Sequence, residues 1–586
     1  MDGFFGRILT VDLDRQNYQI EAVDDDIYRR FLGGKGLASY LLYERNEPGV
    51  DPLSPDNHLV FATGPIAQSS VWGSCRYGVF TKSPLTGFYA ESYSGGRAPE
   101  AMDAAGYDAV LVKGRSGRPA VLTIHPDGVD FHEAGDLWGK DTFEAEDAAL
   151  ERFSDARYRK RGAVVIGPAA ENLVRFSVIE NDYWRSAGRA GVGTVMGSKN
   201  LKALVFQGDR KRPIHDADDL KAFSRDIMET GKESPAAKAY KGMGTPMMVK
   251  VLNGAGAFPT RYWTSGSCSH WENISAEALH SQCEVRPNAC LKCFMACGRM
   301  TTVKHGRHEG LRLEGPEYET IYAFGGLCLV DSIEEICHLN DICDRLGMDT
   351  ITSGNLCAFA IEAVKRGKVS YDIDYGDVDA IADLLRKIAY RDGIGDILAQ
   401  GIKHAAKTWG LEDIAVHAKG MEPAGYDPRV LKGMGLAYAT SDRGACHLRA
   451  TFYKPELSGM IPPDQIKDKA ALFIEFEDRL TVFDALVLCR FYRDMYDWSR
   501  LGTMLSAISG HDAEQATLVG CARSISNIVR RFNIREGLTS DDDRLSKGLF
   551  KKVHETGRCL TEEEMNYMVA DYYRLRGWDE KGIPVE

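Results

Sequence analysis

Short apolar runs bounded by glycine or proline dominate the chain before residue 209. Runs at 5–12 and 18–23 flank the polar stretch 14–17, a pattern typical of a β-hairpin. Two amphipathic stretches predict short helices at 26–32 and 142–153. Further strands are predicted at 59–62, 77–81, 109–112, 120–124 and 163–166. We therefore expect a mixed domain in which β structure carries glycine-rich loops.

Further along the chain the apolar spacing becomes helical. Residues 209–215 are charged and contain Pro213, which indicates a linker. A capping Ser332 and a closing Gly347 frame one of the expected helices. The helices are predicted at 218–229, 332–346, 351–365, 378–390, 394–408, 465–475 and 513–532. Glycine and proline cluster again at 419–428, where a second boundary is expected.

These patterns predict an α+β protein without internal repeats. A β-rich domain at 1–209 is followed by a helical domain at 210–418 and a second helical domain at 419–586. The length of 586 residues agrees with several packed domains, because one core of that size is unusual.

Composition narrows the class of protein further. The net charge of −12 argues against nucleic-acid and acidic-membrane partners. No signal-like start and no run of about eighteen apolar residues is visible, so we expect no membrane span. Fourteen cysteines without a secretory signal indicate reduced thiols and metal ligands. This predicts a cytoplasmic protein in a low-potential setting.

Three of these cysteines form the stretch Cys290-Leu-Lys-Cys293-Phe-Met-Ala-Cys297. The short spacings let three sulfurs converge on one soft metal centre, and a cubane iron–sulfur cluster needs a fourth thiolate from elsewhere in the fold. Cys489 is a remote cysteine of that kind. Structural zinc is the main alternative, but no second C-x2-C pair exists. Inert buried thiols are the remaining alternative, and we expect that state for Cys337, Cys343 and Cys357.

Two glycine-rich regions of the first domain suit a phosphorylated cofactor. Glycine lets backbone N–H groups approach an anion, and interleaved arginine neutralises phosphate. One region spans 69–97 and the other spans 181–199; neither matches a dinucleotide or Walker A fingerprint. Tight turns between strands explain either region about equally well.

Candidate proton carriers and helix ends lie in the later part of the chain. Glu319 follows the cysteine stretch, and His447 lies in a polar loop; a carboxylate and an imidazole are the usual acid–base pair. A salt-bridged glutamate and a satisfied histidine are the structural alternatives. The segments 344–349 and 484–489 share an Asp and an apolar residue at similar spacing, which also suits two ordinary helix ends.

Together these motifs resemble the tungsten-dependent aldehyde:ferredoxin oxidoreductase family over nearly the whole chain. The resemblance rests most on the cysteine stretch and on Gly315-Pro-Glu-Tyr-Glu319. It extends from Gly6-Arg-Ile-Leu-Thr-Val-Asp-Leu, through Arg185-Ser-Ala-Gly-Arg-Ala-Gly-Val-Gly, to Leu575-Arg-Gly-Trp578.

The resemblance implies two pyranopterins that hold tungsten, a 4Fe–4S cluster, and Mg²⁺ bridging the pterin phosphates. It implies that Cys290, Cys293, Cys297 and Cys489 hold the cluster, and that Glu319 and His447 handle protons and orient substrate. The implied cofactor contacts are Arg76, Tyr93, Gly95, Arg185, Ser186, Gly188, Arg189, Asp344, Met348, Asp349, Arg443, Gly444, Arg449, Asp484 and Leu488.

Some positions depart from the family pattern. Tyr93 stands where asparagine is frequent, and Val487 replaces a glycine. Trp72, Tyr183 and Trp184 place bulky aromatic side chains in loops that are usually smaller. The shape of the substrate pocket is therefore not inherited from the resemblance.

The implied activity is oxidation of an aldehyde to a carboxylic acid, with electrons passed to ferredoxin or a ferredoxin-like iron–sulfur subunit. One alternative is a related tungsten-pterin reductase that acts on an activated acid or an aromatic ring. Another is an electron-transfer subunit with a vestigial pterin site, against which the retained Arg76, Arg185 and Arg189 count. A homodimer and a hetero-oligomer both stay open.

Overall fold

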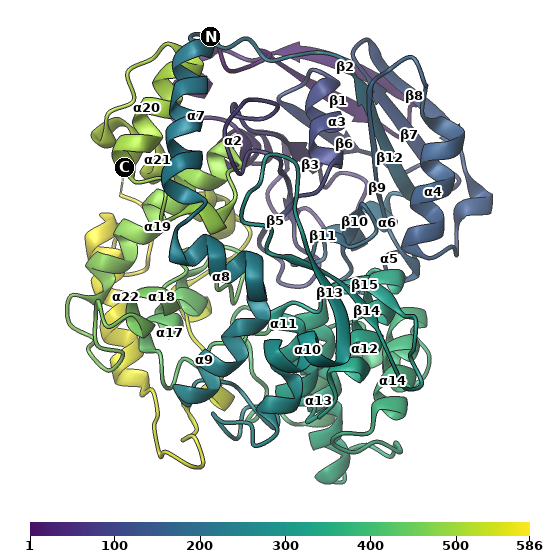
Figure 1. Ribbon diagram of the computed structural model, residues 1–586, viewed down its shortest axis with the longest axis vertical. Helices are drawn as coiled ribbons and strands as arrows, with labels where there is room; N and C mark the ends of the chain where they lie inside the picture. The colour runs from purple at the N-terminus through teal and green to yellow at the C-terminus, as the bar shows by residue number, and fades with distance from the viewer. Residues whose placement is uncertain (586) are drawn as a thin grey trace.

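The computed structural model describes residues 1–585. In Figure 1 the strands lie at the upper right, and helices form the lower half and the left side. The predicted α+β class is confirmed. The division into three domains stays a prediction, because one buried core runs from Leu9 in the first sheet to Trp578 near the C-terminal end.

The first sheet has six strands in the order β2-β1-β6-β3-β4-β5. Its strands are β1 (Arg7–Asp12), β2 (Asn17–Ala22), β3 (Leu59–Ala62), β4 (Tyr77–Lys82), β5 (Tyr89–Ser94) and β6 (Ala109–Lys113). The predicted hairpin is confirmed, because β1 pairs antiparallel with β2 and Leu9 lies opposite Ile20. Every residue of β4 is buried, so both faces of the sheet are covered at this strand. The first glycine-rich region joins β3 to β4 and continues through β5.

The second sheet also has six strands, in the order β11-β10-β9-β12-β7-β8. These strands are β7 (Ala120–His125), β8 (Gly128–Glu133), β9 (Lys160–Val165), β10 (Ile179–Asn181), β11 (Arg185–Ala187) and β12 (Leu201–Gly208). The helices of this half are α1 (Asp25–Phe31), α2 (Gly34–Arg45), α3 (Ala98–Ala104), α4 (Thr142–Phe153), α5 (Pro168–Glu171) and α6 (Val192–Ser198). The second glycine-rich region begins at the last residue of β10 and contains β11 and all of α6, so it lies at the edge of this sheet.

The rest of the chain is mainly helical. Up to residue 409 its helices are α7 (Ala217–Gly231), α8 (Pro235–Met243), α9 (Met248–Gly254), α10 (Ala276–Gln282), α11 (Tyr318–Thr320), α12 (Ile333–Leu346), α13 (Thr350–Lys365), α14 (Val378–Tyr390), α15 (Ile394–Leu398) and α16 (Ile402–Trp409). Beyond it are α17 (Lys432–Thr440), α18 (Tyr453–Leu457), α19 (Lys469–Leu486), α20 (Trp498–Ser509), α21 (Gln515–Arg535) and α22 (Glu562–Arg576). None of the helices within residues 1–585 is long and apolar enough to cross a membrane.

Two predicted helices were wrong in extent. The helix expected at 394–408 is two helices, because the chain bends at Gly401, whose φ is +87°. The helix expected at 465–475 is α19, which begins at Lys469 and continues to Leu486. This helix is longer than predicted because its later turns pack against α2 and α21.

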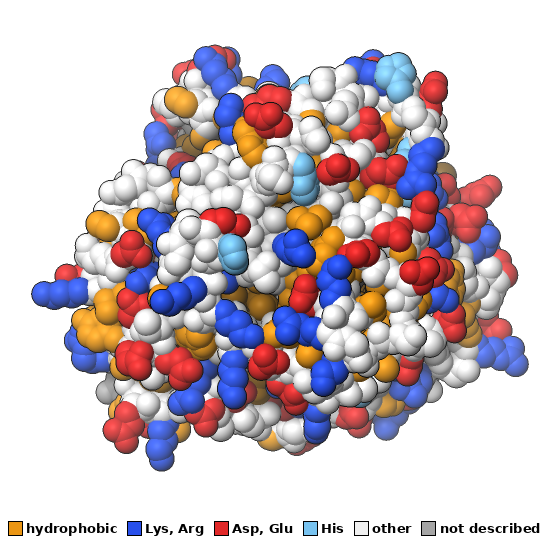
Figure 2. Space-filling view, turned by 90° about the horizontal axis from the view of Figure 1, so that it is seen from below, with side chains coloured by type: hydrophobic (Ala, Val, Ile, Leu, Met, Phe, Trp, Pro, Cys, Tyr) orange, Lys and Arg blue, Asp and Glu red, His pale blue; other side chains and the backbone are white. Residues whose placement is uncertain are grey.

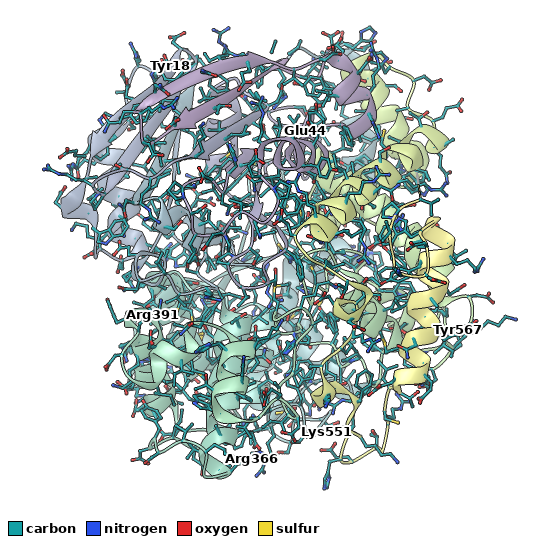
Figure 3. All side chains as sticks on the ribbon, turned by 180° about the vertical axis from the view of Figure 1, so that it is seen from behind. Tyr18, Glu44, Arg366, Arg391, Lys551 and Tyr567 are labelled. Atoms are coloured by element: carbon teal, nitrogen blue, oxygen red, sulfur yellow. The ribbon has the colours of Figure 1, made fainter. Side chains whose placement is uncertain are left out.

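A third, three-stranded sheet of β13 (Cys283–Asn288), β14 (Gly298–Val303) and β15 (Arg312–Glu314) lies where the β-rich and helical parts meet (Figure 1). The outer surface is mixed in charge: in Figure 2 positive and negative side chains are interspersed over the face seen from below. Exposed residues such as Tyr18 and Tyr567 project from the periphery, whereas side chains fill the junction between the parts (Figure 3). The candidate site lies at this junction.

Candidate active site

The cysteine stretch is the loop of a β-hairpin. It begins after Asn288 of β13 and ends before Gly298 of β14, and these two residues are paired. Within the loop Lys292 and Ala296 have φ values of 52° and 44°, so the backbone reverses direction between the cysteines.

The backbone of one residue in the first glycine-rich region joins the hairpin loop to the fourth cysteine. The Gly73 N–H donates to the Lys292 carbonyl at 2.7 Å, and the Cys489 N–H donates to the Gly73 carbonyl at 3.0 Å. Gly73 has a φ of +87°, and a Cβ there would lie 2.8 Å from the Tyr492 ring. Only glycine allows this close approach, and it places Cys489 beside Cys290, Cys293 and Cys297.

All four predicted ligand cysteines line one cavity of about 270 Å³. The same cavity is lined by Arg76, and by Arg185, which forms an ion pair with Glu314. Within residues 1–585 no three His, Cys, Asp or Glu side chains are close enough together to hold a single metal ion. A lone zinc ion needs thiolates at about 2.3 Å. A cubane iron–sulfur cluster needs four thiolates around one cavity, and these four cysteines line such a cavity.

A larger cavity of about 400 Å³ adjoins the cysteine cavity and shares Arg76, Tyr93, Ser186 and Cys489 with it. The predicted cofactor contacts that line this larger cavity are Arg76, Tyr93, Ser186, Gly188, Arg189, Asp344, Met348, Asp349, Arg443, Arg449, Asp484 and Leu488. Of the others, Gly95 and Arg185 line only the cysteine cavity. The structure therefore brings residues from all parts of the chain to one place.

Gly444 lines neither cavity, although the sequence analysis predicted that it contacts a cofactor. Its φ is +111°, and a Cβ there would lie 2.9 Å from the Met421 Cβ. The glycine therefore allows the tight turn that follows Arg443.

Buried guanidinium groups leave hydrogen-bond donors for a ligand in the larger cavity. The Arg443 Nε, the Arg449 Nε and Nη2, and the Arg490 Nη1 are buried without a partner among the described residues. An unpaired buried donor costs free energy, whereas phosphate oxygens would satisfy several of them at once. The side chains present thus fit a phosphate-bearing cofactor.

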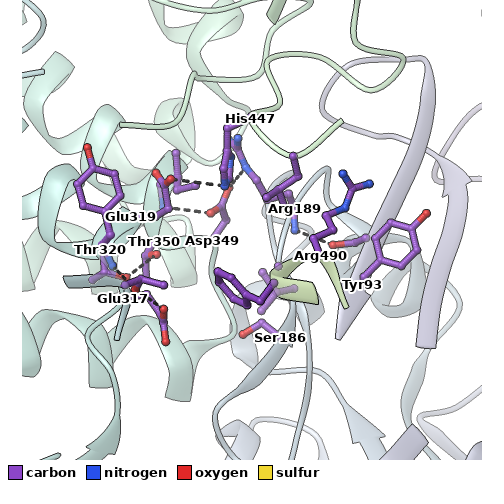
Figure 4. Close-up of a pocket in the computed structure, with 18 of the residues that line it drawn as sticks. Tyr93, Ser186, Arg189, Glu317, Glu319, Thr320, Asp349, Thr350, His447 and Arg490 are labelled. Carbon is purple, nitrogen blue, oxygen red and sulfur yellow. Dashed lines mark hydrogen bonds and ion pairs between the residues drawn. The ribbon is translucent and has the colours of Figure 1, made fainter. Parts of the chain in front are cut away.

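Glu319 and His447 lie side by side in the lining of the larger cavity (Figure 4). Glu319 lies on the short helix α11, and His447 lies on the loop between α17 and α18. The His447 Nε2 lies 3.5 Å from the Glu319 Oε1, while the Glu319 Oε2 accepts a hydrogen bond from the Gly425 N–H at 2.9 Å. The Glu319 Oε1 and the His447 Nδ1 have no hydrogen-bond partner among residues 1–585.

The surroundings shift the pKa values of Glu319 and His447 in opposite directions. Burial raises the pKa of Glu319 to about 8. Burial, together with the charges of Arg189 and Arg443, lowers the pKa of His447 well below its ordinary value. The pair therefore consists of a carboxyl group that titrates near neutral pH and an imidazole that stays neutral.

The helix-end residues support the floor of the site. Asp349 is the N-cap of α13, accepts a hydrogen bond from the Ile351 N–H at 3.0 Å, and pairs with the Arg189 Nε at 3.0 Å. Val487 takes the left-handed position that ends α19, with φ of 55°. A β-branched residue is strained there, which explains why glycine suits this position.

Sequence reasoning missed an ionic network beneath the cavity. The fully buried Glu91 forms ion pairs with Arg449 and with the Lys35 Nζ, which lies 3.1 Å away. Burial alone would raise the pKa of Glu91, but the charges of Arg449 and Lys35 lower it below its usual range. Strand periodicity could have found Glu91, because it lies two positions before Tyr93 on β5 and shares its face.

Comparison with known proteins gives a consistent picture. The family models described as "Aldehyde ferredoxin oxidoreductase, N-terminal domain" and "Aldehyde ferredoxin oxidoreductase, domains 2 & 3" match residues 8–208 and 222–586. Tungsten-containing aldehyde ferredoxin oxidoreductases of Pyrococcus furiosus and Thermococcus kodakarensis are 34% and 35% identical to the chain, over 100% of it and 98% of each relative.

More distant proteins also match over the full length of the chain. The WOR-like subunit of an aliphatic sulfonate oxidoreductase of Pyrococcus furiosus is 27% identical over 100% of this chain and 96% of its own. The active-site complex BamBC of benzoyl coenzyme A reductase contains a chain that superposes with a TM-score of 0.84 at 23% identity, over 100% of this chain and 96% of that one. At that identity the superposition shows the fold alone. The family matches and the full-length identities show that this chain belongs to the aldehyde ferredoxin oxidoreductase family of oxidoreductases.

Proposed function

We propose that the chain oxidises aldehydes to carboxylic acids at a tungsten-bispyranopterin centre and passes the electrons through a 4Fe–4S cluster to ferredoxin or a ferredoxin-like subunit. The reaction converts an aldehyde and water into the acid, two protons and two electrons. The observation that carries the proposal is the Glu319–His447 pair in a cavity that adjoins four cysteines. The tungsten-containing relatives support the choice of metal.

Residues of both cavities would hold the cofactors. Arg76, Arg185 and Arg189 are the proposed phosphate contacts, with Mg²⁺ bridging the phosphates. Cys290, Cys293, Cys297 and Cys489 are the proposed cluster ligands. The remaining proposed pterin contacts are Tyr93, Gly95, Ser186, Gly188, Asp344, Met348, Asp349, Arg443, Arg449, Asp484 and Leu488. When bound, the tungsten centre supplies a Lewis acid and an electron acceptor.

The chain itself supplies proton handling and orientation. His447, held neutral, can donate one N–H to the aldehyde oxygen and so fix the direction of the carbonyl. Glu319 takes a proton from the attacking water through the Oε1 that has no partner within the described chain. The hydrogen bond from the Gly425 N–H holds the other carboxylate oxygen and limits rotation of the group.

The metal content tests the cofactor assignment. Anaerobically purified native protein is expected to contain about one tungsten or molybdenum and about four irons per chain, because one mononuclear centre and one cubane are proposed. Elemental mass spectrometry measures both on one sample. Stoichiometric zinc without iron would contradict the proposal.

The pH profile tests the role of Glu319. Because burial raises its pKa to about 8, the reactive carboxylate forms as pH rises toward that value. We expect kcat/KM for aldehyde oxidation to rise about tenfold per pH unit below the pKa and to level off above it. Viologen reduction under strict anaerobiosis measures the rate. A profile that is flat through this range in wild type would contradict the assignment.

A panel of aldehydes separates the proposed reaction from the reductase alternative. The wild-type protein, loaded with tungsten and iron, is expected to oxidise aliphatic or aromatic aldehydes. If the loaded protein oxidises none of them, a reductase acting on an activated acid or aromatic ring becomes the better description.

A further inference from the structure

Three stacked rings lead away from the acid–base pair along the larger cavity. The His447 ring lies 5.7 Å from the Tyr426 ring with an interplanar angle of 26°, and the Tyr426 ring lies 4.1 Å from the Tyr453 ring at 13°. All three side chains line the cavity. A flat, apolar substrate whose aldehyde group lies at Glu319 and His447 would therefore extend along an aromatic wall.

Arg493 lies at the far end of this wall. Its side chain lines the same cavity next to Tyr453 and Tyr240, and the residue is only 4% exposed. Arg493 is the C-cap of the 3-10 turn Arg490–Tyr492, which follows Cys489. The guanidinium is thus separated from His447 by the Tyr426 and Tyr453 rings.

Arg493 has no counter-ion within the described chain. No carboxylate of residues 1–585 lies within 4.0 Å of its guanidinium nitrogens, and its buried Nε has no hydrogen-bond partner. The Nη1 donates to the Arg490 carbonyl at 3.0 Å. The adjacent Asp494 is half-exposed and forms its ion pair with Lys454 instead.

A buried guanidinium with an N–H donor that lacks an acceptor is unfavourable in free energy unless an anion accepts from it. Arginine stays protonated and carries five N–H donors. At this site the Arg490 carbonyl and Tyr240 accept from other donors of the group, while no group of residues 1–585 accepts from the Nε. Burying an unpaired charge is unfavourable, and proteins avoid this by pairing the charge. Because Arg493 lines the cavity, an anion bound there can supply the partner.

We propose that Arg493 binds an anionic group on the substrate, so that the preferred substrates are flat, apolar aldehydes with a carboxylate or a similar anion at the end away from the carbonyl. This inference rests on the proposed aldehyde oxidation and names its substrate class. Tyr426 and Tyr453 contact the apolar middle of the substrate. Arg493 selects substrates by their length and charge. Arg493 is therefore a specificity-determining residue.

The matched substrates 4-carboxybenzaldehyde and 4-methylbenzaldehyde test the proposal. They differ only in the group that would meet Arg493. We expect wild type to prefer the carboxylate by about 10- to 100-fold in kcat/KM, mainly through KM, because a hydrogen-bonded ion pair discriminates by about that factor. Arg493→Met should remove the preference through a higher KM for the carboxylate compound. Arg493→Lys should restore part of it.

Arg479→Met is the matched control variant. Arg479 is a half-buried cation stacked on Phe476 and near Arg493, but it does not line the cavity. Its loss should leave the preference intact if Arg493 acts by direct contact. An equal loss of preference in Arg479→Met would overturn the direct contact.

Calorimetric binding of the two product acids gives a readout that does not need turnover. Terephthalate should bind the tungsten-loaded wild type more tightly than 4-methylbenzoate, and Arg493→Met should abolish that difference. If no aldehyde is oxidised but this difference is present, the anion site stands and the proposed reaction falls. If aldehydes are oxidised without any preference, or if Arg493→Met loses tungsten or pterin, the inference about Arg493 is overturned.

Discussion

Replacing Glu319 with glutamine is expected to lower aldehyde oxidation by about 10²- to 10⁴-fold, the usual contribution of a positioned acid–base group. Glutamine keeps the size of the side chain and can still accept the hydrogen bond from the Gly425 N–H. It cannot take a proton from water. Tungsten, pterin and iron contents should be unchanged, and the rise of activity with pH toward about 8 should disappear. Viologen reduction and elemental analysis on the same samples measure these effects.

Glu422→Gln is the matched control for this variant. Glu422 is fully buried, burial raises its pKa to about 8 as well, and its Oε2 accepts a hydrogen bond from the Thr352 hydroxyl at 2.9 Å. It does not line the larger cavity. This variant makes the same chemical change away from the proposed reacting atoms, so most activity should remain. Unchanged turnover in Glu319→Gln would refute its role as the base.

Replacing Cys489 with alanine is expected to destroy the cluster and with it nearly all ferredoxin reduction. A cubane held by three thiolates leaves one iron without its protein ligand. The backbone N–H of residue 489 still donates to the Gly73 carbonyl, so the local fold should persist. Iron content and the EPR spectrum of the reduced protein measure the loss.

Cys343→Ala provides the comparison for the cluster. Cys343 lies inside α12, is fully buried, and lines neither cavity. Its replacement should cost some packing free energy and leave the iron content unchanged. Equal iron loss in both variants would show that Cys489 has no special role as a ligand.

The sequence predicted much of the fold where local signals agree with tertiary packing. The helix predicted at 142–153 is correct at both ends, because Asp141 caps it and the helix is amphipathic. Helix α2 was not predicted. Its Gly34 and Gly36 disfavour a helix locally, yet a Cβ at Gly34 would lie 2.6 Å from the Asp484 carbonyl. Tertiary packing requires small residues there and overrides the propensity.

The candidate site was predictable only in part, because the sequence does not show which distant segments meet. The spacing of Cys290, Cys293 and Cys297 indicated one centre. The position of Cys489 beside them depends on the two hydrogen bonds that the backbone of Gly73 makes. The unpartnered state of Arg493 has no sequence signal, since it depends on Asp494 pairing with Lys454.

The backbone of Gly73, which joins the cysteine hairpin to Cys489, has a consequence for how the molecule is made. Its two hydrogen bonds connect residues more than 190 positions apart along the chain, so both are complete only after the late helices have docked. A newly synthesised polypeptide therefore passes through a stage in which the cysteine loop is complete but the fourth thiol has not arrived. A group that binds all four thiols can therefore complete its ligand set only when the late helices dock, so binding of such a group is coupled to the end of folding.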